Sequence, residues 1–261
     1  MSFLEQILKE KESFLEERKK LIPKNAIIDK IVFPLSQPQF KKRLKQKGIH
    51  LIAEIKRASP SKGDLRPNCD ILEIAQIYES KGVGLVSILT EEKFFKGNIE
   101  DMEKIKACTS LAILRKDFII DDYQVLEAKV YGADAILLIV SILDKVKLKE
   151  LISLAKNINL DIVLEVHTEA ELKIALDYNV EIIGINNRNL EDFSIDKGLA
   201  ARLVLHIPED KIIIVESGIQ TDEDLGKVKN LGVNGVLVGE ALMRAENIEK
   251  KVSDFLSVLN K

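Results

Sequence analysis

The feature that most constrains this fold is a regular alternation between short apolar segments and longer amphipathic ones. Eight short runs rich in Ile, Val and Leu recur along the chain, and most of them lack polar alternation. Such runs predict strands that are buried on both faces, as in parallel sheets. The predicted strands are 51–55, 85–89, 111–114, 135–140, 162–166, 181–185, 211–215 and 235–238.

The segments between these runs have the spacing of helices. In 70–80, 123–130 and 146–155, apolar residues recur at intervals of three and four. A capping residue opens several of the segments, and a glycine closes three of them before the next strand. These residues are Asp70, Asp121, Asp144, Thr168 and Thr221, with Gly82, Gly132 and Gly232. Thr168 and Glu171 also fit a capping box.

Eight strand–helix units predict a closed (β/α)8 TIM barrel of the α/β class rather than an open sheet. No Gly-x-Gly-x-x-Gly follows the first predicted strand, which excludes the usual dinucleotide site. The length of 261 residues suits one such barrel. We therefore expect a single domain over 1–261, in which 49–261 form the barrel.

Residues 1–48 do not fit the repeat. Their first part predicts a partly amphipathic helix, and three prolines then break the regularity. The residues concerned are Phe3, Leu4, Ile7, Leu8, Phe14 and Leu15, followed by Pro23, Pro34 and Pro38. We expect an extra N-terminal helical segment laid across one end of the barrel, near its mouth. A frayed, partly disordered tail is the alternative.

Charge and composition limit the classes of partner. The formal net charge of −3 favours neither nucleic acid nor an anionic membrane, and no apolar run is long enough to span a bilayer. Cys69 and Cys108 are far apart and lack the spacing of metal ligands, so they predict reduced thiols. No signal-peptide pattern is visible. We expect a cytoplasmic monomer that acts on a small molecule held by local groups.

Polar residues at the ends of the predicted strands are the candidates for catalysis, because the active site of a TIM barrel lies there. Glu54 and Lys56 are two residues apart, so their side chains project to the same face. Charged groups that converge in an apolar setting perturb one another's pKa values, as acid–base catalysis requires. A structural ion pair is the alternative for any single one. The candidates are Glu54, Lys56, Lys116, Glu165, Asn186, Glu216 and Ser217.

A phosphate site is predicted after the last two strands, where this fold binds phosphate. Gly218 follows the seventh strand, and Gly239 and Glu240 follow the eighth at the start of a short helix. Glycines let backbone N–H groups approach phosphate oxygens, and a helix N-terminus adds a favourable dipole. The alternative for each glycine alone is a plain turn.

Other polar features are expected to be structural or solvated. The histidines lack the spacing of metal ligands and are predicted to be surface or loop residues: His50, His167 and His206. The basic stretch 41–47 is predicted to be a solvated face rather than a nucleic-acid site. Glu91 and Glu92 either touch the site or lie in a solvent-exposed loop.

The chain resembles the indole-3-glycerol phosphate synthase family along nearly its whole length. The most specific blocks are Ile-Ala-Glu-Ile-Lys-Arg-Ala-Ser-Pro-Ser-Lys-Gly at 52–63 and Leu-Arg-Lys-Asp-Phe at 114–118. Further blocks are 87–91, 94–97, 132–138, 184–190, 215–219 and 237–243. The N-terminal extension is also similar to the family's extra segment.

The resemblance implies a reaction and a set of roles. The family converts 1-(2-carboxyphenylamino)-1-deoxyribulose 5-phosphate into indole-3-glycerol phosphate, CO2 and water, without a metal or organic cofactor. By resemblance, Lys116 is the general acid for ring closure, and Lys56 binds the substrate carboxylate and assists dehydration. Glu165 and Glu54 stabilise positive charge or accept the proton; how the acid and base roles divide stays open. Positioning falls to Asn186, Glu216 and Ser217.

The resemblance also implies how the substrate is held. Phe118 forms an apolar wall against the aromatic ring, with core filling as the alternative; Arg188 adds positive charge, and Ser59 contacts the substrate from the first loop. The backbone donors to phosphate are at Gly218, Gly239 and Glu240. Two other readings are another phosphosugar barrel enzyme, such as a phosphoribosyl isomerase, and a non-catalytic barrel that binds a phosphate metabolite.

Overall fold

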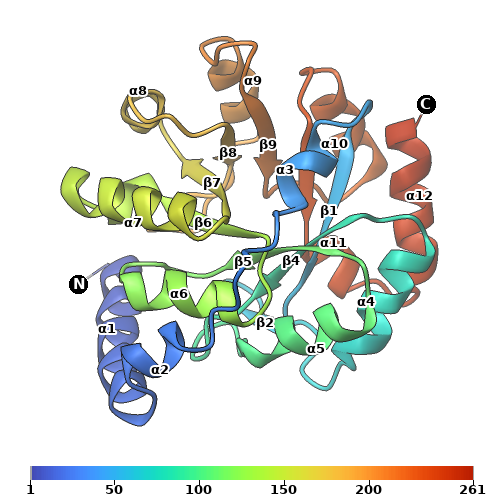
Figure 1. The fold of residues 1–261 in the computed structure, drawn as a ribbon. Helices are drawn as coiled ribbons and strands as arrows, with labels where there is room; N and C mark the ends of the chain where they lie inside the picture. The colour runs from blue at the N-terminus through green and yellow to red at the C-terminus, as the bar shows by residue number, and fades with distance from the viewer. Residues whose placement is uncertain (1, 261) are drawn as a thin grey trace.

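The computed structural model describes residues 2–260 and contains a closed barrel of eight parallel strands (Figure 1). Neighbouring strands pair in chain order, and the last strand pairs with the first, which closes the barrel. The strands are β1 (His50–Ile55), β4 (Leu85–Leu89), β5 (Ala112–Lys116), β6 (Ala135–Ile139), β7 (Asp161–Val166), β8 (Ile182–Asn186), β9 (Ile212–Glu216) and β10 (Gly235–Val238). The predicted TIM barrel is confirmed.

The strand boundaries differ from the predicted ones at functionally important points. The third predicted strand ends at 114, whereas β5 continues through Arg115 and Lys116. The sixth ends at 185, whereas β8 includes Asn186. Apolar periodicity ends a strand at its last hydrophobic residue, but here charged and amide side chains remain in the ladder. Lys116 and Asn186 reach the barrel mouth, and Arg115 pairs with Asp117 and the carbonyl of Gln124, so the backbone need not leave the sheet.

Helices follow the strands and cover the outside of the barrel (Figure 1). They are α4 (Ile71–Ser80), α5 (Glu100–Cys108), α6 (Asp122–Val130), η1 (Val140–Ile142), α7 (Lys145–Asn157), α8 (Glu169–Leu176), α9 (Leu199–Val204), α10 (Asp222–Lys229), α11 (Glu240–Met243) and α12 (Ile248–Asn260). All five predicted N-caps accept backbone N–H hydrogen bonds. Within residues 2–260, no helix is long and apolar enough to cross a membrane.

The local chemistry at the helix ends agrees with the sequence in most places. The three predicted closing glycines have positive φ angles between 72° and 88°, the left-handed region in which glycine is favoured. The capping box predicted for Thr168 and Glu171 forms only in part. Thr168 accepts from the N–H of Glu171, but the Glu171 carboxylate accepts from the N–H of His167.

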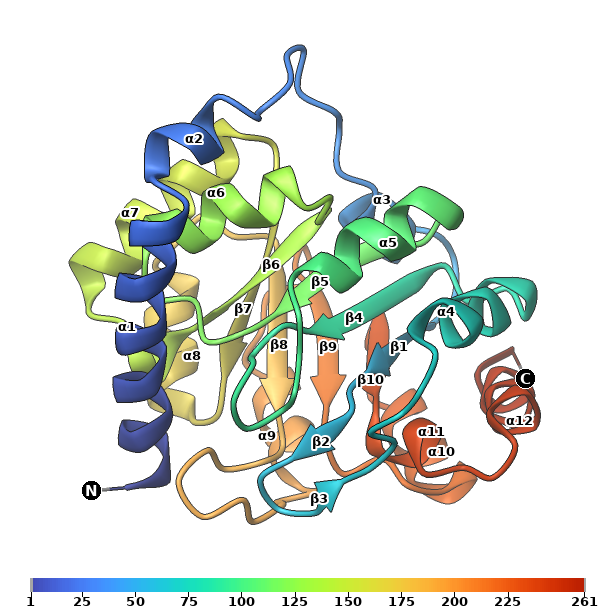
Figure 2. The ribbon, with the colours of Figure 1, turned by 90° about the horizontal axis from the view of Figure 1, so that it is seen from below.

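The N-terminal extension contacts both ends of the barrel instead of lying across one end, which corrects that prediction. It comprises α1 (Phe3–Leu21), α2 (Lys24–Ile28) and α3 (Phe40–Leu44). Figure 2 shows α1 alongside the barrel, with its first turns toward the end where the strand arrows point. Phe40 and Leu44 are fully buried with apolar residues of the barrel interior. The frayed-tail alternative is therefore wrong.

Short α3 seals the amino ends of the strands. The backbone N–H of Gln39 donates to Asp134 at 3.1 Å, and that of Lys41 donates to Asp161 at 2.8 Å. Both aspartates stand at the start of strands β6 and β7. Lys41 and Lys45 also pair with Glu181, so part of the basic stretch 41–47 forms ion pairs at this end.

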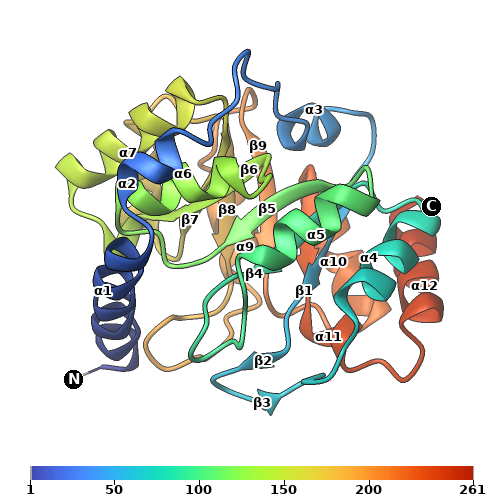
Figure 3. The same ribbon diagram turned by 60° about the horizontal axis from the view of Figure 1, so that its bottom comes forward.

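The opposite, carboxyl end is where loops accumulate. A small antiparallel pair, β2 (Ala58–Ser59) and β3 (Gly63–Asp64), projects from the loop after β1 (Figure 3).

The two cysteines are free thiols, as predicted: neither forms a disulfide within residues 2–260. Cys69 is half-buried and Cys108 is exposed.

Candidate active site

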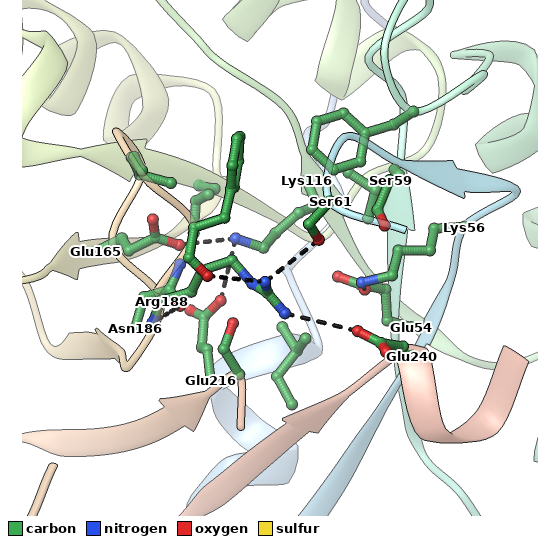
Figure 4. Close-up of a pocket in the computed structure, with 18 of the residues that line it drawn as sticks. Glu54, Lys56, Ser59, Ser61, Lys116, Glu165, Asn186, Arg188, Glu216 and Glu240 are labelled. Carbon is green, nitrogen blue, oxygen red and sulfur yellow. Dashed lines mark hydrogen bonds and ion pairs between the residues drawn. The ribbon is translucent and has the colours of Figure 1, made fainter. Parts of the chain in front are cut away.

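A cavity opens at the carboxyl ends of the strands, at the place expected for this fold (Figure 4). Every one of the predicted catalytic and binding residues lines it. These residues are Glu54, Lys56, Ser59, Lys116, Phe118, Glu165, Asn186, Arg188, Glu216, Ser217, Gly218, Gly239 and Glu240. The predicted residues thus come from five of the eight strands, β1, β5, β7, β8 and β9, and from segments that follow β1, β5, β8, β9 and β10.

Lys116 lies at the centre of a buried charge cluster. Its Nζ is 2.7 Å from Oε2 of Glu165 and 3.1 Å from Oε2 of Glu216 (Figure 4). The three side chains come from β5, β7 and β9, and both carboxylates are almost completely buried. One ammonium is therefore shared between two carboxylates in a setting with little water.

The surroundings shift the pKa values of Lys116, Glu165 and Glu216 in different ways. Burial alone would lower the pKa of Lys116, but the negative charges of Glu165, Glu216 and Glu54 outweigh it and raise the pKa. Burial would raise the pKa of Glu165, but Lys116 and the neighbouring His167 hold it below its ordinary value. Burial and the charge of Glu165 raise the pKa of Glu216 to about 7. Lys116 is thus charged at neutral pH, Glu165 ionised, and Glu216 close to its titration point.

A second pair of opposite charges stands on β1. Nζ of Lys56 is 2.6 Å from Oε1 of Glu54, as their spacing along the strand predicts. The Glu54 carboxylate occupies space that only a glycine at 239 leaves free, because an added Cβ would overlap it. A Cβ on Gly184 would lie 2.7 Å from Oε1 of Glu216. Two glycines therefore make room for two site carboxylates.

The part of the cavity that follows β8 and β9 carries a basic side chain and a tight turn. Arg188 lies 3.6 Å from Glu240 and donates to the Ser61 hydroxyl at 3.4 Å (Figure 4). The backbone at Ser217 and Gly218 has φ angles of 63° and 81°, a rare turn for a serine. Asn187 donates to the Ser217 carbonyl and holds this turn. The buried Ser59 hydroxyl has no hydrogen-bond partner within residues 2–260.

Apolar side chains close the cavity beside the charged groups. Phe118 is 7% exposed and packs against Phe95, with 6.3 Å between ring centroids. Sequence reasoning placed Phe118 here but missed Ile7 of α1, Phe95 and Leu190, which line the same wall. Ile7 was visible only as an apolar residue of an extension helix, so nothing in its pattern indicated a cavity wall.

His167 lies in the loop between β7 and α8, as the loop alternative predicted, but its side chain is only 10% exposed and is therefore not a surface group. Its Nε2 is 3.1 Å from Oε1 of Glu165, a carboxylate of the cluster around Lys116. A usable signal was present: Glu165 and His167 are two residues apart at a strand end, as Glu54 and Lys56 are. His206, in contrast, is exposed as predicted.

The open alternatives for Glu91 and Glu92 resolve into structural roles. Glu91 is 2% exposed, and its carboxylate accepts the backbone N–H groups of Phe94 and Phe95. Glu92 pairs at 2.7 Å with Lys11 of α1, and neither glutamate lines the cavity. The loop after β4 is therefore held in place from within and from the N-terminal helix.

Comparison with known proteins shows which family this chain is similar to. The model of the indole-3-glycerol phosphate synthase family matches residues 4–255. Indole-3-glycerol phosphate synthase of Thermoanaerobacter pseudethanolicus is 43% identical over 253 residues, which cover 97% of this chain and 96% of the relative. The enzyme of that name from a strain of Dehalococcoides mccartyi is 45% identical over 258 residues, covering 97% of this chain and 99% of the relative.

Solved structures with the same fold are more distant in sequence. A 3-hexulose-6-phosphate synthase from Salmonella typhimurium superposes with a TM-score of 0.65 at 14% identity, over 81% of this chain and 99% of that one. A thiamine phosphate pyrophosphorylase from Pyrococcus furiosus superposes with a TM-score of 0.61 at 17% identity, over 81% and 96%. These likenesses show the barrel fold alone. The family match and the close relatives show more: this chain belongs to the indole-3-glycerol phosphate synthase family.

Proposed function

We propose that the cavity performs the ring closure of tryptophan biosynthesis, in which a carboxy-lyase makes indole-3-glycerol phosphate, and that the residues around Lys116 and Lys56 carry it out. The ring carbon that bears the carboxylate attacks the ketone carbon while an acid protonates the ketone oxygen. CO2 then leaves, and its bonding electrons restore the aromatic ring. Finally the hydroxyl leaves as water with help from an acid, and a base removes a proton from the carbon next to nitrogen.

Lys116 is the general acid for ring closure in this proposal. The observation that carries the assignment is its position between two buried carboxylates, 2.7 Å from Glu165 and 3.1 Å from Glu216. The raised pKa of Lys116, which the charges of those carboxylates cause against the effect of burial, keeps a proton available. When the proton moves to substrate, the two carboxylates and the neutral amine remain poised to recover it.

Lys56 holds the carboxylate of the substrate and assists dehydration. Its Nζ lies at the cavity wall, tethered to Glu54 at 2.6 Å. Binding the departing carboxylate would hold it out of the ring plane, where its bond can break. Glu165 is the proton acceptor, because its lowered pKa, maintained by Lys116 and His167 against burial, keeps it ionised. Glu54 and Asn186 orient these groups.

In this proposal the phosphate lies in the part of the cavity that follows β9 and β10. Backbone N–H groups near Gly218, Gly239 and Glu240 would donate to its oxygens, and the charge of Arg188 would offset its own. Ser59 offers a hydroxyl that lacks a protein partner within residues 2–260. The aromatic ring of the substrate would rest against Phe118. This orientation places the ketone between Lys116 and Lys56.

A single chain suffices for this activity in our proposal, because its own residues bring both lysines and their carboxylate partners into one cavity. We propose a monomer that works in the cytoplasm without nucleic acid or membrane partners, consistent with its two free cysteines and net charge of −3. Light scattering at the concentration of the assay tests the oligomeric state; a stable dimer would contradict the proposed monomer.

The test of the function is direct. The purified protein is incubated with 1-(2-carboxyphenylamino)-1-deoxyribulose 5-phosphate, and the fluorescence of the indole product is followed together with released CO2. We expect equal amounts of both products. Substrate that binds without turnover would contradict the proposed chemistry and support the non-catalytic alternative.

A further inference from the structure

His167 bridges two carboxylates at the edge of the active site. Its Nε2 faces Oε1 of Glu165 at 3.1 Å, and its Nδ1 faces Oε2 of Glu171 at 3.2 Å. The ring itself does not line the substrate cavity. It borders a neighbouring pocket between the start of α8 and the loop after β8. His167 therefore contacts Glu165 from outside the substrate cavity.

The chain builds this bridge from one short segment. Glu165 ends the inward-facing row of β7, and His167, two residues later, points to the same side. Glu171 lies in the first turn of α8, and its carboxylate also accepts the backbone N–H of His167 and the hydroxyl of Thr168. Three donors therefore hold the Glu171 carboxylate in place: the backbone N–H and Nδ1 of His167 and the hydroxyl of Thr168. The Glu171 carboxylate in turn orients the His167 ring.

The bridge gives Glu165 a cation that Glu216 lacks. Oε2 of Glu165 faces Lys116 and Oε1 faces His167, so each oxygen of this buried carboxylate has a positive partner. Among residues 2–260, Lys116 is the one cation that pairs with Glu216, at 3.1 Å. Two carboxylates around one lysine would otherwise compete equally for its charge. The histidine breaks that symmetry.

Nδ1 forms a hydrogen bond with Glu171, whereas Nε2 and Oε1 of Glu165 are close enough for an ion pair without forming a hydrogen bond. The doubly protonated imidazolium is the form of the ring that carries the positive charge such a pair needs. The other charged groups that line the pocket beside the ring are Glu169, Glu191, Asp196 and Arg202. Three of those four are acidic, which favours the charged ring further. The ring faces Glu165 from β7 and Glu171 from α8.

We propose that His167 is a positioning residue which, as an imidazolium, orients Glu165 and keeps it ionised, so that Glu165 and not Glu216 accepts the proton during the reaction. This inference rests on the proposed role of Glu165 for its catalytic part. Its structural part, the charged bridge, stands independently and is tested first.

The charged bridge is tested by NMR titration of the histidine rings in the wild-type protein. The chain has three histidines, so comparison with His167→Gln assigns the signal. We expect the pKa of His167, raised by the two carboxylates against the effect of burial, to be about 9, well above the ordinary histidine value of about 6.5. In Glu171→Gln the pKa of His167 should fall. A pKa of His167 at or below the ordinary histidine value of about 6.5 would overturn the bridge.

The positioning role is tested by the pH dependence of kcat in His167→Gln, with His206→Gln as the matched control. Without the imidazolium, the pKa of Glu165 rises, so the acidic limb of the profile should move upward by about one pH unit or more. KM should change little, because His167 does not line the cavity. Glu171→Gln should shift the limb in the same direction by less.

The two proposals fail separately. An unchanged pH profile in a folded His167→Gln variant would overturn the positioning role, even if the titration shows a charged ring. If instead Glu165→Gln retains the wild-type kcat, the proposed role of Glu165 as proton acceptor is wrong, while a high pKa of His167 would still support the bridge.

Discussion

At the scale of single residues, two glutamates of the site have different pKa values because their neighbours differ. Glu165 and Glu216 are both buried beside Lys116, yet the pKa of one is lowered and that of the other raised to about 7. Strand spacing predicted that these side chains converge. It could not predict how they pair, because each partner comes from a distant strand and the distances depend on barrel closure.

Gly239 is expected to matter for Glu54 as well as for phosphate. An added Cβ would overlap the Glu54 carboxylate, so Gly239→Ala should displace that carboxylate from Lys56 and lower kcat along with phosphate affinity. Steady-state kinetics measure both effects. Gly226→Ala is the matched control, because open space surrounds Gly226 in α10, and alanine should stabilise that helix by about 0.5–1 kcal/mol. An unchanged kcat in Gly239→Ala would contradict the steric argument.

The His167 bridge also predicts a pH-dependent stability. Burial would lower the pKa of His167, but the carboxylates of Glu165 and Glu171 outweigh it and raise the pKa to about 9 from an unfolded value near 6.5. The contribution of His167 to the free energy of unfolding is therefore complete below its pKa in the unfolded chain. It is lost as the pH rises through its pKa in the folded protein. His167→Gln should cost more free energy of unfolding near pH 6 than near pH 10, by up to about 3 kcal/mol.

Urea unfolding of both proteins at the two pH values measures this difference. His206→Gln, at an exposed position, should show no such dependence. An equal cost of the His167 substitution at both pH values would contradict the charged bridge.

At the scale of elements, the sequence predicted the eight strands because strands buried on both faces read as continuous apolar runs. The N-terminal extension was harder. Helix α3 has only five residues, too few for a periodic pattern, yet Phe40 and Leu44 seal the barrel. Lys11 looked like one of many lysines on a charged helix face. Its buried ion pairs with Glu92 and Asp117 join segments that lie far apart in the chain.

Lys11 ties α1 to the residue next to Lys116. Its Nζ is 2.9 Å from Asp117, whose pKa burial would raise but Lys11 and Arg115 hold below its ordinary value. Lys11→Met should leave Asp117 short of a partner and destabilise the protein by about 3 kcal/mol. Because Asp117 leads into Phe118, kcat should fall as well. Urea unfolding and kinetics, with exposed Lys9→Met as control, measure both. If Lys11→Met lost no more stability and kcat than Lys9→Met, the proposed role of the Lys11–Asp117 ion pair would be wrong.

At the scale of the whole molecule, we propose that the extension and the barrel form one cooperative unit. Arg18 of α1 pairs with the buried Glu127 of α6, and the hydroxyl of Tyr123 donates to the carbonyl of Ile22. At the mouth, Phe3 packs edge-on against Phe94 and Phe193, at 5.1 and 5.0 Å between ring centroids. These contacts run the length of α1, so the helix joins the barrel wall to its mouth.

Truncation separates the two functions of the extension. Deleting residues 1–30 removes α1 and α2 but keeps α3, so a less stable barrel should remain, with a higher KM because Ile7 no longer lines the cavity. Deleting residues 1–46 also removes Phe40 and Leu44, and losing each such buried side chain costs about 2–5 kcal/mol; this form should be insoluble. Circular dichroism and kinetics decide. If the protein that lacks residues 1–46 were folded and fully active, the extension and the barrel would not form one cooperative unit.

The central claim is that Lys116, held between Glu165 and Glu216, supplies the proton for ring closure. Its most direct test is kcat of Lys116→Ala at saturating substrate, followed by indole fluorescence, with exposed Lys149→Ala as control. Our account predicts a fall in kcat of about 10²–10⁴ with substrate binding largely kept, and no change in the control. A Lys116→Ala variant with a kcat near that of the wild type would contradict it.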